Sequence, residues 1–199
     1  MRRRIAASLL ATLVCTLAVS AASGQTQDAQ QEPQIPAAKQ TSPGLYLTAK
    51  QAYEKWQAEP EKMKVLDVRT LEEFIFIGHA EMAWNVPLAV QTDQWDAEKR
   101  HFAMQPDPTF ASRVKAVFAP EDTLLVMCRS GGRSAMAVNL LAEAGFKNVY
   151  NITDGMEGDK VEDPGSAYHG KRMKNGWKNS GLPWTYQLDS ERIFLPERQ

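Results

Sequence analysis

Seven consecutive residues, Cys128-Arg-Ser-Gly-Gly-Arg-Ser134, combine a nucleophile, two cations and two glycines. The glycines allow the backbone to curl so that successive N–H groups converge on one point. A helix that begins in this stretch directs the positive end of its dipole to the same point. Such a cradle favours the thiolate of Cys128, and it can hold a persulfide or an anionic sulfur donor.

The same cysteine has a simpler interpretation. It follows the apolar run 123–127, so it could be only a small hydrophobic residue that ends a core strand. Its position immediately before a glycine-rich loop with Arg129 and Arg133 favours a reactive thiol instead.

The second cysteine, Cys15, lies in a segment with the layout of a secretory signal peptide. Arginines at 2–4 precede an apolar run over 5–19, and small residues follow at 21–24. The run is short for a membrane-spanning helix, which needs about 20 apolar residues, so we expect cleavage near Gly24 rather than a membrane anchor. The sequence therefore predicts a periplasmic or otherwise exported protein that has no stable membrane insertion, with Cys128 as the one cysteine of the mature chain.

The elements around the cysteine alternate between strand and helix, which predicts a single α/β domain with a parallel sheet. Two candidate capping boxes, at 48–51 and 70–73, predict helix starts, and Asp107-Pro108 predicts the start of a third helix over 109–118. The main predicted segments are strands at 63–68, 123–127 and 148–152 and helices at 49–57 and 134–144.

Composition sets limits on the class of protein. The chain has 199 residues, of which 43% are hydrophobic, enough to fill the core of one domain. A formal net charge of −1 gives no general attraction to nucleic acid or to anionic membranes. His79, His101 and His169 lack the spacing of metal ligands, so we expect neither a metal nor an organic cofactor.

Several motifs in order resemble the rhodanese (sulfurtransferase) family. The loop 128–134 resembles the active-site loop of its single-domain members, and the resemblance extends over about residues 45–185. Further matching motifs are Leu66-Asp-Val-Arg69, Glu73-Phe74, Gly78-His79, Asn85-Val-Pro-Leu88, Asp154-Gly-Met156 and Gly181-Leu-Pro183. The resemblance implies a central parallel sheet flanked by helices, with Cys128 accepting sulfane sulfur and passing it to a nucleophilic acceptor.

The expected function is therefore transfer of sulfane sulfur from a small anionic donor such as thiosulfate to a thiol or protein acceptor. The candidate donor-binding residues are those of the loop, Arg129, Ser130, Gly131, Gly132, Arg133 and Ser134. A non-catalytic sulfur carrier that docks on a partner is the alternative. A cysteine-dependent phosphatase is less favoured, because it needs an arginine at position 134, where this chain has serine.

Other conserved-type polar residues have both functional and structural interpretations. Asp67 and Arg69 should emerge at the same sheet edge as Cys128, where they could orient the loop or substrate or form a structural salt bridge. His79 follows a glycine in a turn, and we expect it to be a hydrogen-bonded structural residue. The tryptophans are expected to serve in packing.

An insertion over 159–176 departs from the family pattern and contains Pro164 and Gly170, so we expect a loop. It should begin beside Cys128, either as a lid or docking surface or as a plain surface loop; its candidate contacts are Tyr168, His169, Lys171, Arg172 and Lys174. The expected organisation is a signal peptide at 1–24, a flexible leader at 25–43, a domain at 44–190 and a tail at 191–199.

Overall fold

The computed structural model describes residues 34–194. The predicted signal peptide, residues 1–24, lies outside the described residues. Within 34–194, no helix has both the length and the apolar character that are needed to cross a bilayer.

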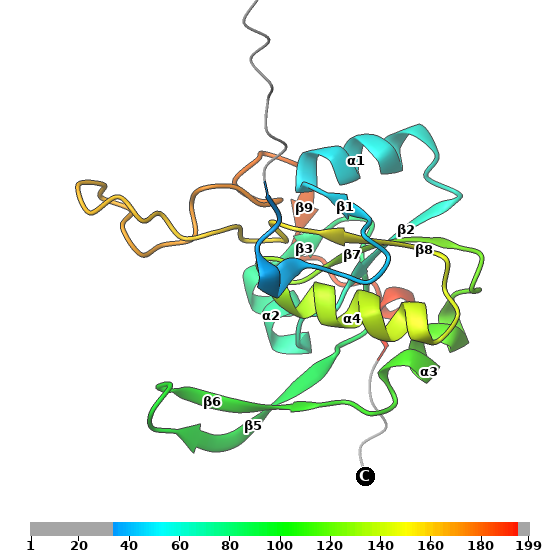
Figure 1. Ribbon diagram of the computed structural model, residues 1–199, viewed down its shortest axis with the longest axis horizontal. Helices are drawn as coiled ribbons and strands as arrows, with labels where there is room; N and C mark the ends of the chain where they lie inside the picture. Colours follow the sequence, from blue (N-terminus) through cyan, green and yellow to red (C-terminus); the bar gives the residue numbers. More distant parts are fainter. Residues whose placement is uncertain (1–33, 195–199) are drawn as a thin grey trace, which may run out of the picture. The chain divides into compact units, whose positions relative to one another are not determined.

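A five-stranded parallel sheet forms the centre of the domain, with strand order β1-β8-β7-β2-β4 (Figure 1). The strands are β1 (Tyr46–Leu47), β2 (Met63–Asp67), β4 (Trp84–Asn85), β7 (Thr123–Met127) and β8 (Asn148–Ile152). β7 lies in the middle and is almost entirely buried, as its uninterrupted apolar sequence predicts. The predicted α/β fold with a central parallel sheet is thereby confirmed.

Four helices cover the two faces of the sheet: α1 (Ala49–Ala58), α2 (Leu71–Ile77), α3 (Phe110–Val117) and α4 (Gly132–Glu143). α3 and α4 contribute to one core, together with Leu66, Leu124 and Val126. α1 and α2 contribute to the other core, on the opposite face (Figure 1). The alternation of side chains along β2 and β7 divides their residues between the two cores.

Local sequence signals explain how the helices begin. Thr48 and Thr70 both form the predicted capping boxes, each with the residue three positions later. α3 differs slightly from the prediction, because its N-cap is Thr109 rather than Asp107. The Asp107 carboxylate still accepts hydrogen bonds from the backbone N–H (2.8 Å) and hydroxyl (2.6 Å) of Thr109, so it closes the turn before the helix.

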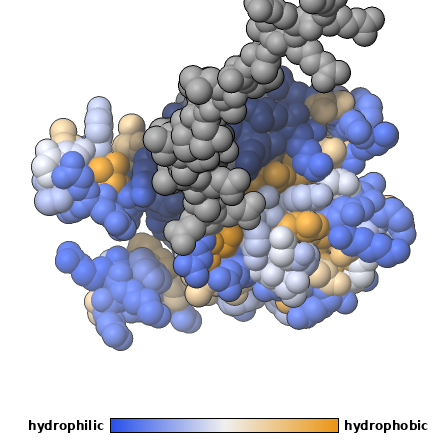
Figure 2. All heavy atoms as spheres, turned by 45° about the horizontal axis from the view of Figure 1, so that its top comes forward, coloured by the Kyte–Doolittle hydropathy of each residue, from blue (hydrophilic) through white to orange (hydrophobic). Residues whose placement is uncertain are grey.

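A two-stranded antiparallel hairpin, β5 (Ala89–Asp96) and β6 (His101–Pro106), projects from the domain and was not predicted. Trp95 and Phe102 pack edge to face on it, with Trp95 57% exposed, so this tryptophan does not join a core. The hairpin and the insertion form separate projections, and hydrophilic residues cover most of the described surface on the face drawn in Figure 2. A second small sheet pairs β3 (His79–Ala80) with β9 (Trp184–Thr185).

Both ends of the described chain contact the domain. The 3₁₀ helix η1 (Ala37–Lys39) and the residues after it lie against α4, where the backbone N–H of Ser42 donates to Asn139 Oδ1 at 2.8 Å. Part of the range expected to be a flexible leader is therefore packed in this structure. At the other end, after the 3₁₀ helix η2 (Ser190–Arg192), the Phe194 backbone N–H donates to Asn85 O at 2.9 Å.

Candidate functional site

Cys128 directly follows β7 at the carboxyl edge of the sheet, and only 2% of it is exposed. The backbone N–H of Gly131 donates to its Sγ at 3.2 Å. α4 begins at Gly132, so the N–H groups of its first turn have no partner within the helix. They are available for a sulfur atom that extends from Sγ. The loop thus forms the cradle that the sequence predicts for residues 128–134.

Gly131 allows this loop to close. Its φ of +99° is left-handed, and a Cβ built on it would lie 2.2 Å from the backbone oxygen of Thr153. The loop is also held from behind, because Met156 N donates to Cys128 O at 2.8 Å and Glu157 N donates to Arg129 O at 2.9 Å. The segment after β8 therefore fixes the backbone on which the cysteine sits.

Ser134 lies beside the sulfur rather than in front of it. Its hydroxyl is 3.5 Å from Cys128 Sγ and 2.6 Å from Asn151 Oδ1, and the residue is fully buried. The Asn151 amide in turn donates to the backbone oxygens of Gly131 (3.2 Å) and Lys39 (2.9 Å). Position 134, where a cysteine-dependent phosphatase requires arginine, is occupied by a small hydroxyl that contacts the nucleophile itself.

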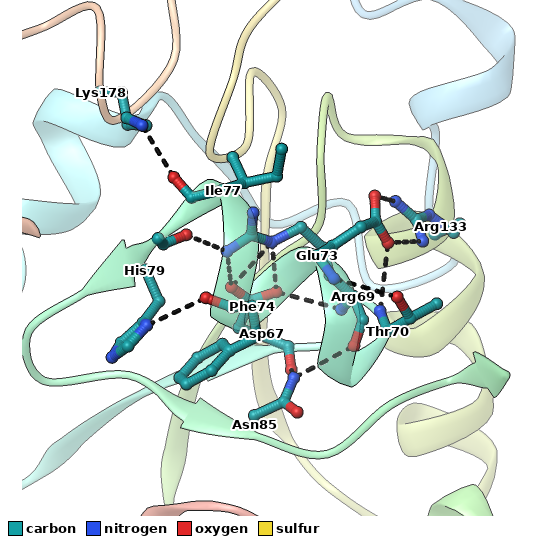
Figure 3. Close-up of polar contacts among 11 residues, drawn as sticks. Asp67, Arg69, Thr70, Glu73, Phe74, Ile77, His79, Asn85, Arg133 and Lys178 are labelled. Carbon is teal, nitrogen blue, oxygen red and sulfur yellow. Dashed lines mark hydrogen bonds and ion pairs between the residues drawn. The ribbon is translucent and has the colours of Figure 1, made fainter. Parts of the chain in front are cut away.

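Arg133 does not point a free charge at the donor. Its guanidinium forms a two-point ion pair with the Glu73 carboxylate, at 2.6 and 2.7 Å (Figure 3). Glu73 also accepts from the backbone N–H of Thr70 at 3.1 Å, so the pair joins the start of α2 to the start of α4. Burial raises the pKa of Glu73, but the hydrogen bond and charge of Arg133 outweigh it and hold that pKa below its usual value.

Asp67 and Arg69 form a second ion pair, with both side chains fully buried and Nη2 2.6 Å from Oδ2 (Figure 3). Arg69 also donates to Gly78 O at 2.8 Å, and Asn85 donates to Arg69 O at 3.1 Å. Burial lowers the pKa of Arg69, and the charge and hydrogen bond of Asp67 raise it above its usual value. The pair is positioned to hold the turn after β2 in place.

His79 has structural contacts. Its ring stacks on Phe74 with 3.7 Å between centroids, and Nδ1 lies 3.2 Å from Phe74 O (Figure 3). Burial lowers the pKa of His79, which favours the neutral ring. Within residues 34–194, no group of three or more His, Cys, Asp or Glu side chains could hold a metal ion.

The structure thus brings Gly131, Gly132 and Ser134 around Cys128 and leaves Ser130 half-buried and Arg129 exposed at the loop. Glu73 and Asn151 were not predicted as site residues. Asn151 could have been found from its place near the carboxyl end of the strand beside β7, an edge where α/β folds place functional groups. Glu73 is 60 residues away from its partner Arg133, and no local pattern reveals that pairing.

An α/β domain with a cysteine at the turn between a central strand and a helix defines a class of proteins that act through a nucleophilic thiol. The model of the rhodanese-like domain family matches residues 48–162. This chain belongs to the rhodanese-like family, which supports the sulfurtransferase class as its general kind of protein.

Individual relatives agree with this assignment. The chain is 39% identical over 92 residues to thiosulfate sulfurtransferase 16 of Arabidopsis thaliana, covering 46% of this chain and 69% of that protein. It is 38% identical over 66 residues to an uncharacterized protein of Rickettsia prowazekii, covering 33% of this chain and 44% of that one. The crystal structure of Rv0390 from M. tuberculosis shares 26% identity with a TM-score of 0.55, over 71% of this chain and 97% of that one.

Proposed function

We propose that this protein is a sulfurtransferase that moves sulfane sulfur from an anionic donor to a thiophilic acceptor through a persulfide on Cys128. The observation that carries the proposal is the position of Cys128 Sγ, which accepts from Gly131 N at 3.2 Å in front of the first turn of α4. An anionic sulfur is stabilised at a helix N-terminus by unpaired N–H groups and by the helix dipole.

With thiosulfate as donor, the Cys128 thiolate attacks the outer, sulfane sulfur. A new S–S bond forms to Sγ while the S–S bond of thiosulfate breaks, and the electron pair leaves with sulfite. The enzyme then carries a persulfide with one negative charge. An acceptor such as cyanide attacks the terminal sulfur, which restores the thiolate and releases thiocyanate. Charge and sulfur balance in both steps, and no oxidant is required.

The geometry around Sγ supports a small anionic sulfur over a phosphoryl group. A phosphoryl group needs a guanidinium over its equatorial oxygens, whereas Ser134 occupies the corresponding position in this loop and Arg133 is paired with Glu73. The Ser134 hydroxyl, 3.5 Å from Sγ, is a further donor to a sulfur anion.

The first experiment is the formation of thiocyanate from thiosulfate and cyanide by the mature protein, beside the Cys128→Ser variant. Cysteine-dependent turnover supports the proposal. A folded protein whose Cys128 is alkylated readily but gives no thiocyanate would contradict the enzyme and favour a sulfur carrier. Mass spectrometry after thiosulfate alone separates these results, since a gain of about 32 Da, the mass of one sulfur atom, marks the persulfide.

Export is a separate part of the proposal and is supported by the arrangement of residues 1–24. Expression of the full chain in a Gram-negative host should give a periplasmic protein that begins near Gln25. A product found only in the cytoplasm with residues 1–24 intact would contradict export without affecting the proposed chemistry.

A further inference from the structure

The insertion 159–176 returns a cation to the catalytic loop. Just before it, Gly158 N donates to Arg129 O at 3.3 Å, so the chain leaves the domain from the residue next to Cys128. Near its end, Arg172 Nη1 donates to the Gly158 backbone oxygen at 2.7 Å. Two hydrogen bonds therefore connect the Arg172 guanidinium, through Gly158, to the backbone of Arg129.

The base of the insertion is built firmly, which limits where Arg172 can move. Asp159 forms an ion pair with Lys39 at 2.8 Å, and its backbone N–H donates to Asn175 Oδ1 at 2.7 Å. Gly158 and Gly176 pack so closely that a Cβ on either would clash with the other arm. Isolated β-bridges join residues 160 and 172 and residues 161 and 169, so the projection seen in Figure 1 is a paired arm.

The charges around the loop leave two arginines available. Arg133 is neutralised by Glu73, but among residues 34–194 neither Arg129 nor Arg172 forms an ion pair within 4.0 Å. Burial lowers the pKa of the Arg172 guanidinium, and the positive charge of Arg129 lowers it further, while negative charges nearby, including the Cys128 thiolate, oppose this. Two like charges held close together without a counterion favour the binding of an anion.

We propose that Arg172, together with Arg129, binds the anionic head of the sulfur donor in front of Cys128 and so sets the preference of this protein for anionic donors. The chemical class is a sulfonate-like oxyanion that carries a sulfane sulfur, for which guanidinium groups supply matched hydrogen-bond donors. The same charges stabilise the negative charge that gathers on the leaving sulfite. This role deepens the proposed function and rests on it, and it gives the insertion a part in donor recognition.

The test uses two alkylating reagents that differ in charge, so it needs no sulfur transfer. Iodoacetate is an anion and iodoacetamide is neutral, and both alkylate the thiolate of Cys128. We expect the iodoacetate-to-iodoacetamide rate ratio to fall about two- to fivefold in Arg172→Gln, the range for one partly exposed charge. The rate of persulfide formation from the dianion thiosulfate should fall by about the square of that factor, because the interaction energy doubles with the charge.

Lys147→Gln is the matched control. It removes one positive charge from an exposed residue directly before β8, at the end of that strand away from the site. Five strand residues span about 17 Å, beyond the roughly 10 Å over which 0.1 M salt leaves exposed charges unscreened. This variant should keep the wild-type ratio, and Arg172→Lys, which keeps the charge, should retain most of it.

The outcomes separate this inference from the proposed function. A lower ratio in Arg172→Gln but not in Lys147→Gln supports the anion site, even if thiosulfate gives no persulfide. An unchanged ratio in a folded Arg172→Gln protein overturns the anion site, even if the wild type turns thiosulfate over. Salt provides a measurement on the wild type alone: raising the salt concentration should slow iodoacetate more than iodoacetamide, and equal slowing also overturns the inference.

Discussion

The ion pair between Glu73 and Arg133 gives the sharpest test of how the site is held together. The two single variants Glu73→Gln and Arg133→Gln and the double variant form a double-mutant cycle, which isolates the energy of the pair. Glutamine at position 73 can still serve in the capping box of α2, because the third helical position of that motif accepts Gln as well as Glu. The cycle therefore removes charges while it keeps the helix start.

The magnitude follows from the geometry and burial of the pair. Its hydrogen bonds measure 2.6 and 2.7 Å, and the two side chains are 21% and 22% exposed. Exposed pairs contribute about 0.2–1 kcal/mol, and breaking a buried pair costs about 3–5 kcal/mol. For a pair between these limits we expect each single variant to lose about 1.5–3 kcal/mol of unfolding free energy, with a coupling energy of about 1–3 kcal/mol.

The pH dependence has a defined sign. Burial raises the pKa of Glu73, but Arg133 outweighs burial, so the pKa in the folded protein lies below its value in the unfolded chain. The stability from the charged carboxylate is therefore fully present above the unfolded pKa of about 4.3 and is lost as the pH falls through the folded pKa. The difference in unfolding free energy between wild type and Glu73→Gln should shrink below about pH 4.

Urea unfolding at a series of pH values from 7 down to 3 measures both quantities, with the denaturant slopes compared between variants. A coupling energy below about 0.5 kcal/mol at pH 7 would place the pair with weak surface contacts and refute the reasoning. A coupling energy that stays constant to pH 3 would refute it as well, since a protonated Glu73 cannot form the ion pair.

Two further changes test the loop around the sulfur. Gly131→Ala places a Cβ 2.2 Å from Thr153 O, so it should destabilise the domain and slow alkylation of Cys128, whereas Gly145→Ala, at a similar φ of +100° in open space, should cost only about 1–2 kcal/mol; equal effects on alkylation would contradict the role of the close approach. Ser134→Ala removes the donor to Asn151 Oδ1, so denaturation should show a loss of about 1–3 kcal/mol and persulfide formation should slow; an unchanged rate would remove Ser134 from the site.

Local sequence signals predicted the parts of the fold that depend on neighbouring residues. The continuous apolar run of β7, with five residues at 123–127, reveals a strand buried on both faces. Thr48 and Thr70 mark helix starts because their partners lie three residues away. The loop 128–134 indicates its chemistry because the glycines, the arginines and the cysteine are consecutive.

The parts that sequence reasoning missed depend on tertiary contacts. The charge of Arg133 is cancelled by a carboxylate 60 residues earlier, so the sequence alone suggests a free cation. The polar leader lacks hydrophobic residues, which predicts flexibility, yet Lys39 contacts the loop and the insertion through a specific ion pair. The β5–β6 hairpin was missed because it buries little, so its strands lack the apolar alternation that reveals half-buried strands.

The contacts of Lys39 have a consequence for how the protein folds. Its ion pair with Asp159 closes a separation of 120 residues, and its backbone oxygen meets the Asn151 amide across 112. Contacts between such distant residues form only after a large loss of chain entropy, so they tend to come late in folding. The β7–α4–β8 unit can assemble first from nearby residues, and the walls around its cysteine then close last. By the same reasoning, those walls are the part expected to open first in native-state hydrogen exchange, which would expose Cys128 while the sheet remains intact.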